Sequence, residues 1–289
     1  MSSFGSSAFN NLPITQIKIF FARILYKTVK LIYRKDIRRI ERDGIHYEID
    51  LSEGIELSLF LFGNFQKHVS QNRFITIPKD GIIFDIGANV GLMSLQFAKL
   101  VPQGKIYSFE PTHYAYQRLL KNCSLNPELA DRIVITQTFI SAESKKDAGI
   151  QAFSSWKVDG SKGDVMHPLH LGTAKPTEGV ASVTLNDFCS AKGIQRIDFI
   201  KIDTDGHEFE ILKGASDTIA RFRPSIILEI GLYVMTEKGI DFTFYSEYFG
   251  KLNYKMMDAK TGEQITLENH KKHIPLKGTI DMLAFPLKQ

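Results

Sequence analysis

The spacing of apolar positions divides the chain into three regions with different predicted structure. In residues 14–33 the apolar side chains recur at helical spacing while Lys and Arg fill another face, which predicts a basic amphipathic helix. Residues 37–63 alternate and turn like a hairpin, which predicts a small β cap. Later in the chain, short apolar runs alternate with helix-period segments, as in βα units around a largely parallel sheet. The expected regions are an N-terminal helix in residues 1–36, a β cap region in 37–78 and a main α/β domain in 79–289.

The main domain contains enough apolar runs for a large sheet. The predicted strands comprise residues 82–86, 105–109, 133–136, 181–184, 199–203, 225–230, 254–258 and 280–286. The predicted helices comprise residues 92–100, 113–126, 185–192, 207–222 and 242–252. Residues 141–179 interrupt this alternation, because they are polar and contain five glycines. A long insertion of this kind is usually functional or disordered.

The composition is that of a globular protein with a local basic patch. The chain has 289 residues, 43% hydrophobic and 24% charged, which suits one large domain with an extension and excludes wholesale disorder. Residues 18–42 hold nine Lys or Arg and two acidic residues, whereas the remainder has 27 basic and 30 acidic residues. This distribution disfavours nucleic acid as a partner. Two interpretations of the basic helix in 14–42 remain: packing on the main domain or a second subunit, or contact with an inner-membrane surface or another polyanion.

The cysteine, histidine and hydropathy patterns argue against a disulfide-rich, metal-binding, secreted or membrane-spanning protein. Cys123 and Cys189 can form neither a disulfide framework nor a zinc cluster by themselves, so we expect reduced thiols in a cytoplasmic protein. His167 and His170, near Asp164, have weak metal-ligand spacing; a plain loop is favoured and no metal is expected. Lysine and arginine interrupt the N-terminal apolar stretch, so we expect neither a secretory signal nor a membrane-spanning helix.

The strongest chemical signal is the segment FDIGANVG at residues 84–91, where an apolar strand opens through two glycines into a helix. Glycine lets the backbone approach a ligand closely, and a helix N-terminus presents free N–H groups. A dinucleotide fingerprint would need glycine where Asn89 and Leu92 stand. Asp85, just before the first glycine, suits a ligand with a positive charge, such as an amine or a sulfonium. Glu110 ends the next strand, where its carboxylate can accept hydrogen bonds from both hydroxyls of a ribose.

This pairing resembles the AdoMet-binding half of class I methyltransferases, and three further segments are similar to the FkbM family. They are IKIDTDGHE at residues 200–208, LKGA at 212–215 and RPSIILEI at 223–230. The resemblance implies a Rossmann-like seven-stranded, mostly parallel sheet flanked by helices, and an AdoMet-dependent O-methyltransferase that modifies a hydroxyl, often on a sugar or a polyketide. The implied cofactor-binding residues are Asp85, Gly87, Asn89, Gly91, Glu110 and Ser141. Gly87 and Gly91 have a structural alternative, since they also allow tight strand–helix packing.

Methyl transfer to a hydroxyl requires alignment and a group that takes the proton. The acceptor oxygen must lie about 3–3.5 Å from the methyl group along the reaction axis. A carboxylate or imidazole within hydrogen-bond reach is expected as the base, and Asp203, Asp205 and His207 are the nearest candidates in sequence. Asp205 stands where the family usually has Glu, and His207 where it usually has a small residue. Asp203 can alternatively cap the next helix, and His207 can be an exposed histidine of its first turn.

Three residues are predicted to contact the acceptor. Glu229 ends its strand and Lys201 alternates with Asp203 on one face of its strand, and each can instead form a structural ion pair. Trp156 can stack on a sugar or anchor its loop. We expect the acceptor to be a sugar of a cell-surface polysaccharide or glycolipid. A small natural product as acceptor, and a catalytically silent AdoMet-binding module, remain as alternatives. An RNA or DNA methyltransferase is disfavoured, because no NPPY-like or DPPY-like segment follows the fourth strand of the main domain.

Overall fold

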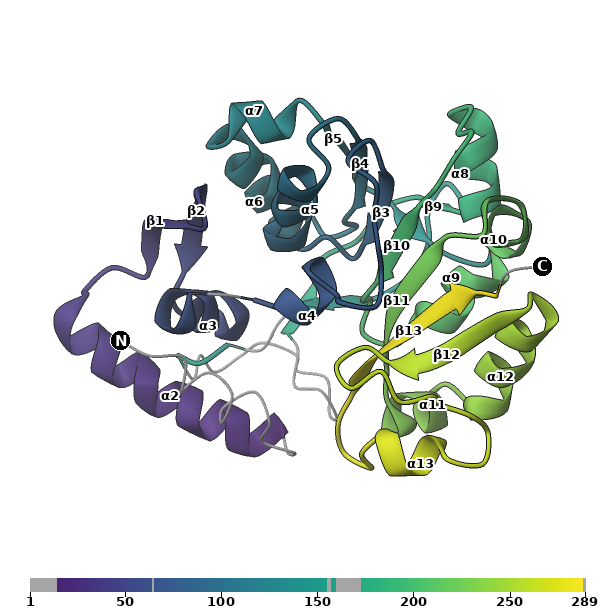
Figure 1. The fold of residues 1–289 in the computed structure, drawn as a ribbon. Helices are drawn as coiled ribbons and strands as arrows, with labels where there is room; N and C mark the ends of the chain where they lie inside the picture. Colours follow the sequence, from purple (N-terminus) through teal and green to yellow (C-terminus); the bar gives the residue numbers. More distant parts are fainter. Residues whose placement is uncertain (1–14, 64, 155–156, 160–172, 288–289) are drawn as a thin grey trace.

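A seven-stranded sheet forms the centre of the computed structural model, with helices on both faces and an N-terminal unit at one end (Figure 1). The structure describes residues 15–63, 65–154, 157–159 and 173–287. The strand order across the sheet is β12-β13-β11-β10-β3-β4-β5. The strands are β3 (Ile82–Ile86), β4 (Lys105–Phe109), β5 (Ile133–Thr136), β10 (Phe199–Ile202), β11 (Ser225–Ile230), β12 (Tyr254–Asp258) and β13 (Ile280–Pro286).

The sheet is mostly parallel, which confirms the predicted fold class. β3, β4, β5, β10 and β11 run in one direction, and β13 is inserted antiparallel between β11 and β12. The carboxyl ends of the parallel strands therefore meet the beginning of β13 at one edge. Ligands bind outside this edge in open α/β sheets.

Alternate residues of the central strands bury on opposite faces of the sheet. Phe84 packs against Phe188 of α8 at a ring-centroid distance of 6.0 Å, within one apolar core. Its neighbour Ile83 belongs to the core on the other face, where Phe97 of α5 packs 5.6 Å from Phe199. The flanking helices are α5 (Leu92–Leu100), α6 (His113–Ser124), α7 (Pro127–Ala130), α8 (Leu185–Ala191), α9 (Glu208–Lys213), α10 (Ser216–Phe222), α11 (Leu232–Glu237), α12 (Phe242–Lys251) and α13 (His270–His273).

The single helix predicted for residues 207–222 is wrong, because the chain forms α9 and α10 with a break at Gly214 and Ala215. A Cβ on Gly214 would lie 2.1 Å from the carbonyl oxygen of Ser141. The break thus lets two backbone segments touch, and this tertiary contact overrides a helical period that continues through it.

The N-terminal unit comprises α2 (Thr15–Ile32), β1 (Ile37–Arg42), β2 (Ile45–Asp50), α3 (Gly54–Phe62) and α4 (Lys67–Ser70). The basic helix and the hairpin β1–β2 are confirmed. The strand-like interpretation of residues up to 63 is wrong in its second half, where α3 forms. A short, almost continuous apolar run fits a strand or a buried helix equally well. The helix ends at Gly63, whose φ of 73° is the left-handed conformation typical of a helix C-terminus.

The N-terminal unit shares a core with the main domain. Tyr47 of β2 and Leu57 of α3 bury in one cluster with Leu95 of α5 and Leu119 of α6. Next to this core, the Arg118 guanidinium donates to both carboxylate oxygens of Glu56 at 2.5 and 2.6 Å. α3 is thereby fixed on α6.

One short ladder lies within the predicted insertion and another flanks it. β7 (Ala152–Ser154) pairs antiparallel with β8 (Thr173–Lys175) inside it, and β6 (Phe139–Ile140) pairs parallel with β9 (Ser182–Val183) on either side of it. The run predicted as a strand over 181–184 thus pairs outside the main sheet. Trp156, His167 and His170 lie outside the described residues.

Two sequence expectations concern the whole chain. In the part that the structure describes, every helix is too short or too polar to cross a bilayer. Cys123 and Cys189 are both buried and unpaired.

Candidate active site

The turn between β3 and α5 requires glycine at two positions. Gly87 and Gly91 have φ values of 80° and 86°, in the left-handed region that other residues adopt only with strain. A Cβ on Gly87 would lie 1.9 Å from the carbonyl oxygen of Asp203, and one on Gly91 would lie 2.4 Å from Leu119 Cδ1. Asn89, with a φ of 50°, takes another left-handed position in the turn. Close packing therefore accounts for both glycines, and their contact with a cofactor stays a prediction.

Glu110 lies directly after β4, beside this turn, and is 6% exposed. Its Oε2 accepts the backbone N–H of Asn89 at 2.9 Å. Its Oε1 accepts the backbone N–H and the hydroxyl of Thr112 at 2.9 and 2.6 Å. Burial raises the pKa of the Glu110 carboxyl, although these hydrogen bonds oppose the shift. The contacts fix Glu110 against the turn, and Oε2 retains a lone pair for an incoming hydroxyl.

Asp85 and Lys201 form a buried ion pair beneath the turn. They stand opposite each other on β3 and β10, and the Lys201 Nζ lies 3.3 Å from Asp85 Oδ1. The ammonium also donates to the carbonyl oxygen of Gly87 at 2.8 Å, while the Ser94 hydroxyl donates to Asp85 Oδ2 at 2.6 Å. Burial lowers the pKa of the Lys201 ammonium, but Asp85 and Asp203 raise it by more, and the net shift is upward. Lys201 therefore forms the structural ion pair, and its contact with an acceptor stays a prediction.

Asp203 directly follows β10 at the open edge of the sheet. Its side chain is 27% exposed and its Oδ2 lies 3.7 Å from the Lys201 Nζ. The same oxygen accepts a hydrogen bond of 3.4 Å from Gln66 Nε2, which the N-terminal unit supplies. The alternative that Asp203 caps the next helix is wrong, because α9 begins at Glu208 and its N-cap residue is His207.

Glu208 accepts hydrogen bonds from the loop after β10, on both sides of Asp205. The buried Glu208 Oε1 accepts from the backbone N–H groups of Thr204 and Gly206 at 2.9 and 3.2 Å, and from the Thr204 hydroxyl at 3.0 Å. Surrounding protein atoms raise the pKa of the Asp205 carboxyl, and the Asp203 and Glu208 carboxylates raise it further, to about 8. The Asp205 side chain is nonetheless exposed, and water screens the electrostatic contributions of the two neighbouring carboxylates. The Asp205 backbone has a φ of 51°. Asp205 thus keeps its proton to higher pH than an ordinary aspartate.

His207 is half-buried beside this loop. Burial lowers the pKa of its imidazole to about 4, with a contribution from the nearby Lys238 ammonium. The neutral ring accepts a proton but holds it weakly.

Glu229 of β11 lies at the same edge. Its Oε1 accepts the hydroxyl of Thr279 at 2.6 Å, and β13 places Asp281 directly opposite it. Burial raises the pKa of the Glu229 carboxyl well above its usual value, and Asp203, Asp281 and Asp205 raise it further. Glu229 therefore stays protonated at a pH where an ordinary glutamate is ionised.

The sequence prediction missed Asp281 and His68, which extend this carboxyl-rich edge. The His68 Nε2, from α4, lies 2.5 Å from Asp281 Oδ2. The two residues are 213 positions apart, and no local pattern connects them. The order of strands in a seven-stranded sheet of this kind would have placed the last strand beside β11. It would not have given the register that sets Asp281 opposite Glu229.

Ser141 lies at a junction with α9 and α10. Its N–H donates to the carbonyl oxygen of Val183 at 3.1 Å, and its own carbonyl faces Gly214. These backbone contacts explain its position, and cofactor binding by Ser141 stays a prediction.

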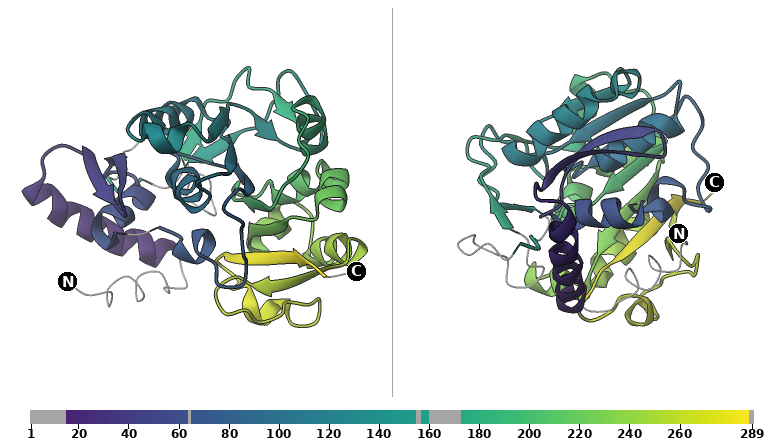
Figure 2. Two further views of the ribbon diagram at one scale, coloured as in Figure 1. Left: turned by 45° about the horizontal axis from the view of Figure 1, so that its top comes forward. Right: turned by 90° about the vertical axis from the view of Figure 1, so that its left-hand side faces the viewer.

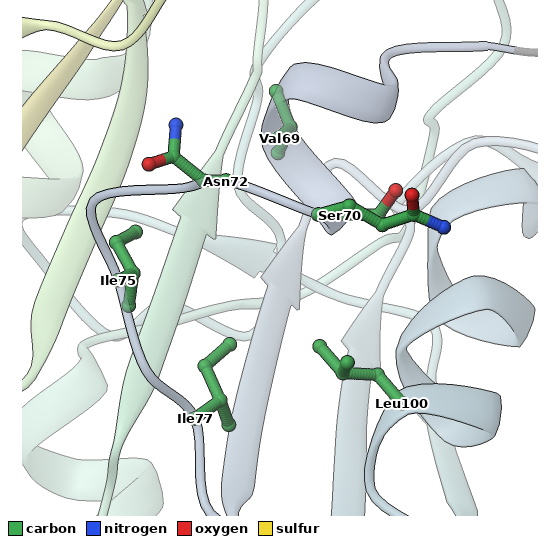
Figure 3. Close-up of a pocket in the computed structure, with 7 residues that line it drawn as sticks. Val69, Ser70, Asn72, Ile75, Ile77 and Leu100 are labelled. Atoms are coloured by element: carbon green, nitrogen blue, oxygen red, sulfur yellow. The ribbon is translucent and has the colours of Figure 1, made fainter. Parts of the chain in front are cut away.

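A small cavity of about 80 Å³ lies beside α4, and none of the predicted site residues lines it (Figure 3). Val69, Ile75, Ile77 and Leu100 contribute to its lining. Ligand pockets typically measure about 300–1,000 Å³. This cavity is too small for a nucleoside cofactor.

The family model of the methyltransferase FkbM domain matches residues 85–256. The chain belongs to the FkbM methyltransferase family. The match begins at Asp85 and includes the turn, Glu110, the Asp205 loop and Glu229.

Two relatives of this chain and one solved structure, all three named as methyltransferases, illustrate the similarity. Methyltransferase sdnD of Sordaria araneosa is 26% identical over 217 residues, covering 64% of this chain and 83% of sdnD. The 2-O-methyltransferase NoeI of Sinorhizobium fredii is 28% identical over 152 residues, covering 50% of this chain and 61% of NoeI. A crystal structure of methyltransferase FkbM from Methylobacillus flagellatus superposes with a TM-score of 0.46 and 16% identity, over 75% of this chain and 47% of that one.

AdoMet is the cofactor of this FkbM methyltransferase, and the residues at the edge fit it. Glu110 Oε2 has a free lone pair for a ribose hydroxyl. The Asp85 Oδ1 lies 3.3 Å from the Lys201 Nζ, so the ion pair balances the charge behind the turn, and contact between Asp85 and the cofactor stays a prediction. Among the described residues no cluster of three or more His, Cys, Asp or Glu is arranged to hold a metal ion.

Proposed function

We propose that this methyltransferase transfers the AdoMet methyl group to a hydroxyl of a sugar in a cell-surface polysaccharide or glycolipid. The observation that carries the proposal is the carboxyl-rich edge formed by Asp203, Asp205 and Glu229, of which Asp205 is exposed and the other two are half-buried. Carboxyl groups hydrogen-bond the several hydroxyls of a sugar, and one of them is needed to take a proton. The similarity to NoeI, whose name specifies 2-O-methyl transfer, supports oxygen as the acceptor atom.

Asp205 is the residue best suited to act as the base. Bound AdoMet supplies a methyl group on a positively charged sulfur, and the protein must hold the acceptor oxygen about 3–3.5 Å from it. Asp205 is exposed and has a raised pKa, so it binds a proton more tightly than an ordinary aspartate. Asp203 is engaged by Gln66 and Lys201, and the lowered pKa of His207 makes it a weak base.

The cytoplasm is the compartment that we propose for this reaction. The thiols of Cys123 and Cys189 are buried and unpaired, as suits a reducing environment. Methylation there would precede export of the glycan.

Turnover of AdoMet with a panel of free and lipid-linked sugars tests the proposal. Asp205→Asn should lower the turnover rate about 10²–10⁴-fold and leave AdoMet affinity unchanged, because a general base acts in the transition state. Glu210→Gln is the matched control, since Glu210 lies on α9 and, among the residues that the structure describes, forms an ion pair only with the exposed Lys213 at 3.6 Å. It should leave turnover unchanged.

Other outcomes contradict specific parts of the proposal. AdoMet binding without methylation of any acceptor would identify a binding module. Methylation of small hydroxyl compounds but of no sugar would favour a natural product as acceptor. Full turnover by Asp205→Asn would remove Asp205 from the role of base.

A further inference from the structure

Helix α2 is attached to the protein through one apolar face. Ala22 and Val29 are 3% and 7% exposed and lie in the core of the N-terminal unit. The hydroxyl of Tyr26 donates to Asp36 at 2.9 Å, and the Lys30 ammonium lies 3.0 Å from the same carboxylate. These contacts fix which side of α2 faces outward.

A second apolar face of α2 is exposed. Ile24, Leu31 and Ile32 are 46%, 86% and 73% exposed, and we call them the apolar strip. Ile24 and Leu31 are seven residues apart and so lie on the same side of the helix, about 200° around the axis from Ala22 and Val29. Figure 1 shows α2 at the outer edge of the molecule, and the right-hand view of Figure 2 shows it in front of the sheet. The stripe that the sequence pattern suggested as a packing face therefore points partly to solvent.

Unpaired cations border the apolar strip. Arg23, Lys27 and Arg34 are exposed, and we call them the cationic row. None of the three forms an ion pair with any residue that the structure describes. The helix sequence contains no acidic residue.

We propose that α2 docks the protein on an anionic lipid surface, lying parallel to it. An interfacial helix has this composition, with an apolar face for the acyl boundary and cations for the lipid phosphates. An uncharged protein surface would bury the apolar strip but leave the cationic row unpaired, and RNA would pair the cations but leave the strip in water. An anionic bilayer satisfies both. This docking does not depend on the identity of the acceptor.

Co-sedimentation of the full chain with lipid vesicles tests the proposal. Binding to equimolar phosphatidylcholine and phosphatidylglycerol should exceed binding to phosphatidylcholine alone, and salt should weaken it because screening shortens the reach of the field. Arg23→Gln with Lys27→Gln should lower partitioning about 30-fold. Leu31→Ser with Ile32→Ser should lower it about tenfold or more. Both pairs are exposed, so the fold should survive, and circular dichroism checks this.

Matched controls come from the other end of the molecule. Lys271→Gln with Lys272→Gln removes two exposed cations of α13, and Leu276→Ser removes a leucine that is 78% exposed. These variants should bind vesicles like the unmodified chain.

Four outcomes would overturn the proposal. They are equal binding to neutral and anionic vesicles, no binding to either, full binding by the strip and row variants, and loss of binding in the α13 controls. Light scattering that shows a dimer converted to a monomer by the strip variant would assign the face to a second copy. Loss of a labelled RNA oligonucleotide in the row variant but not in the strip variant would assign it to nucleic acid.

Discussion

Replacing Lys201 by methionine should destabilise the protein strongly, because the change leaves a buried carboxylate without its cation. Asp85 is fully buried and Lys201 is 4% exposed. The ammonium lies 3.3 Å from Asp85 Oδ1 and donates to the carbonyl oxygen of Gly87. Methionine has a similar length and fills most of the space but supplies neither contact.

The expected loss in the free energy of unfolding is about 3–5 kcal/mol, the usual cost of breaking a buried pair on one side. An exposed pair provides the comparison. Glu247 and Lys251 are 64% and 79% exposed and 3.8 Å apart, and Lys251→Met should cost about 0.5 kcal/mol or less. The two lysines differ in burial, so the difference between the two losses in free energy of unfolding measures the effect of burying the ion pair.

Urea unfolding followed by circular dichroism gives both values, with the slope of the transition checked for two-state behaviour. The double variant Lys201→Met with Asp85→Asn should recover at least half of the loss, since a neutral amide no longer needs the cation. A Lys201→Met protein within about 1 kcal/mol of the unmodified chain, at unchanged slope, would refute the interpretation. A double variant no more stable than the single one would show that packing, not charge, carries the cost.

Three further changes test the turn and the two carboxyl groups. Gly87→Ala should cost more stability in urea than Gly193→Ala, because both positions have positive φ but only a Cβ at 87 would meet the backbone of Asp203, and equal costs would contradict this. Between pH 5 and pH 8 the Glu229→Gln protein should lose less thermal stability than the unmodified chain. The raised pKa of Glu229 contributes stability that is fully present below the pKa of the unfolded chain and is lost as pH rises towards the folded pKa, and glutamine has no such group. Parallel curves of stability against pH would contradict this. Glu110→Gln should weaken AdoMet binding in calorimetry by about 1–3 kcal/mol, because every neighbour of this carboxylate is a donor, and an unchanged affinity would remove Glu110 from the cofactor site.

The elements that carry the predicted cofactor residues could be placed from sequence because they are close together in the chain. The strand β3, the glycine turn and α5 are consecutive, and Glu110 directly follows the next strand, β4. Short apolar runs also mark β4, β5 and β11 at their observed bounds. Local patterns suffice where local geometry places the side chains.

The remaining differences arise where tertiary contacts decide. α3 has an apolar pattern that fits two structures, and burial in the shared core selects the helix. α9 and α10 separate where Gly214 touches the backbone of Ser141. Neither contact has a signature within the segment that it shapes.

The carboxyl-rich edge combines residues that the sequence pattern assigned to separate regions. Gln66 and His68 come from the predicted cap region, yet they contact Asp203 after β10 and Asp281 of β13. The Arg118–Glu56 pair and the shared apolar core hold the N-terminal unit on α5 and α6 while these contacts form. A chain starting at residue 79 would therefore keep the glycine turn and Glu110, but it would expose part of its core and lose two polar side chains at the edge where the acceptor is proposed to bind.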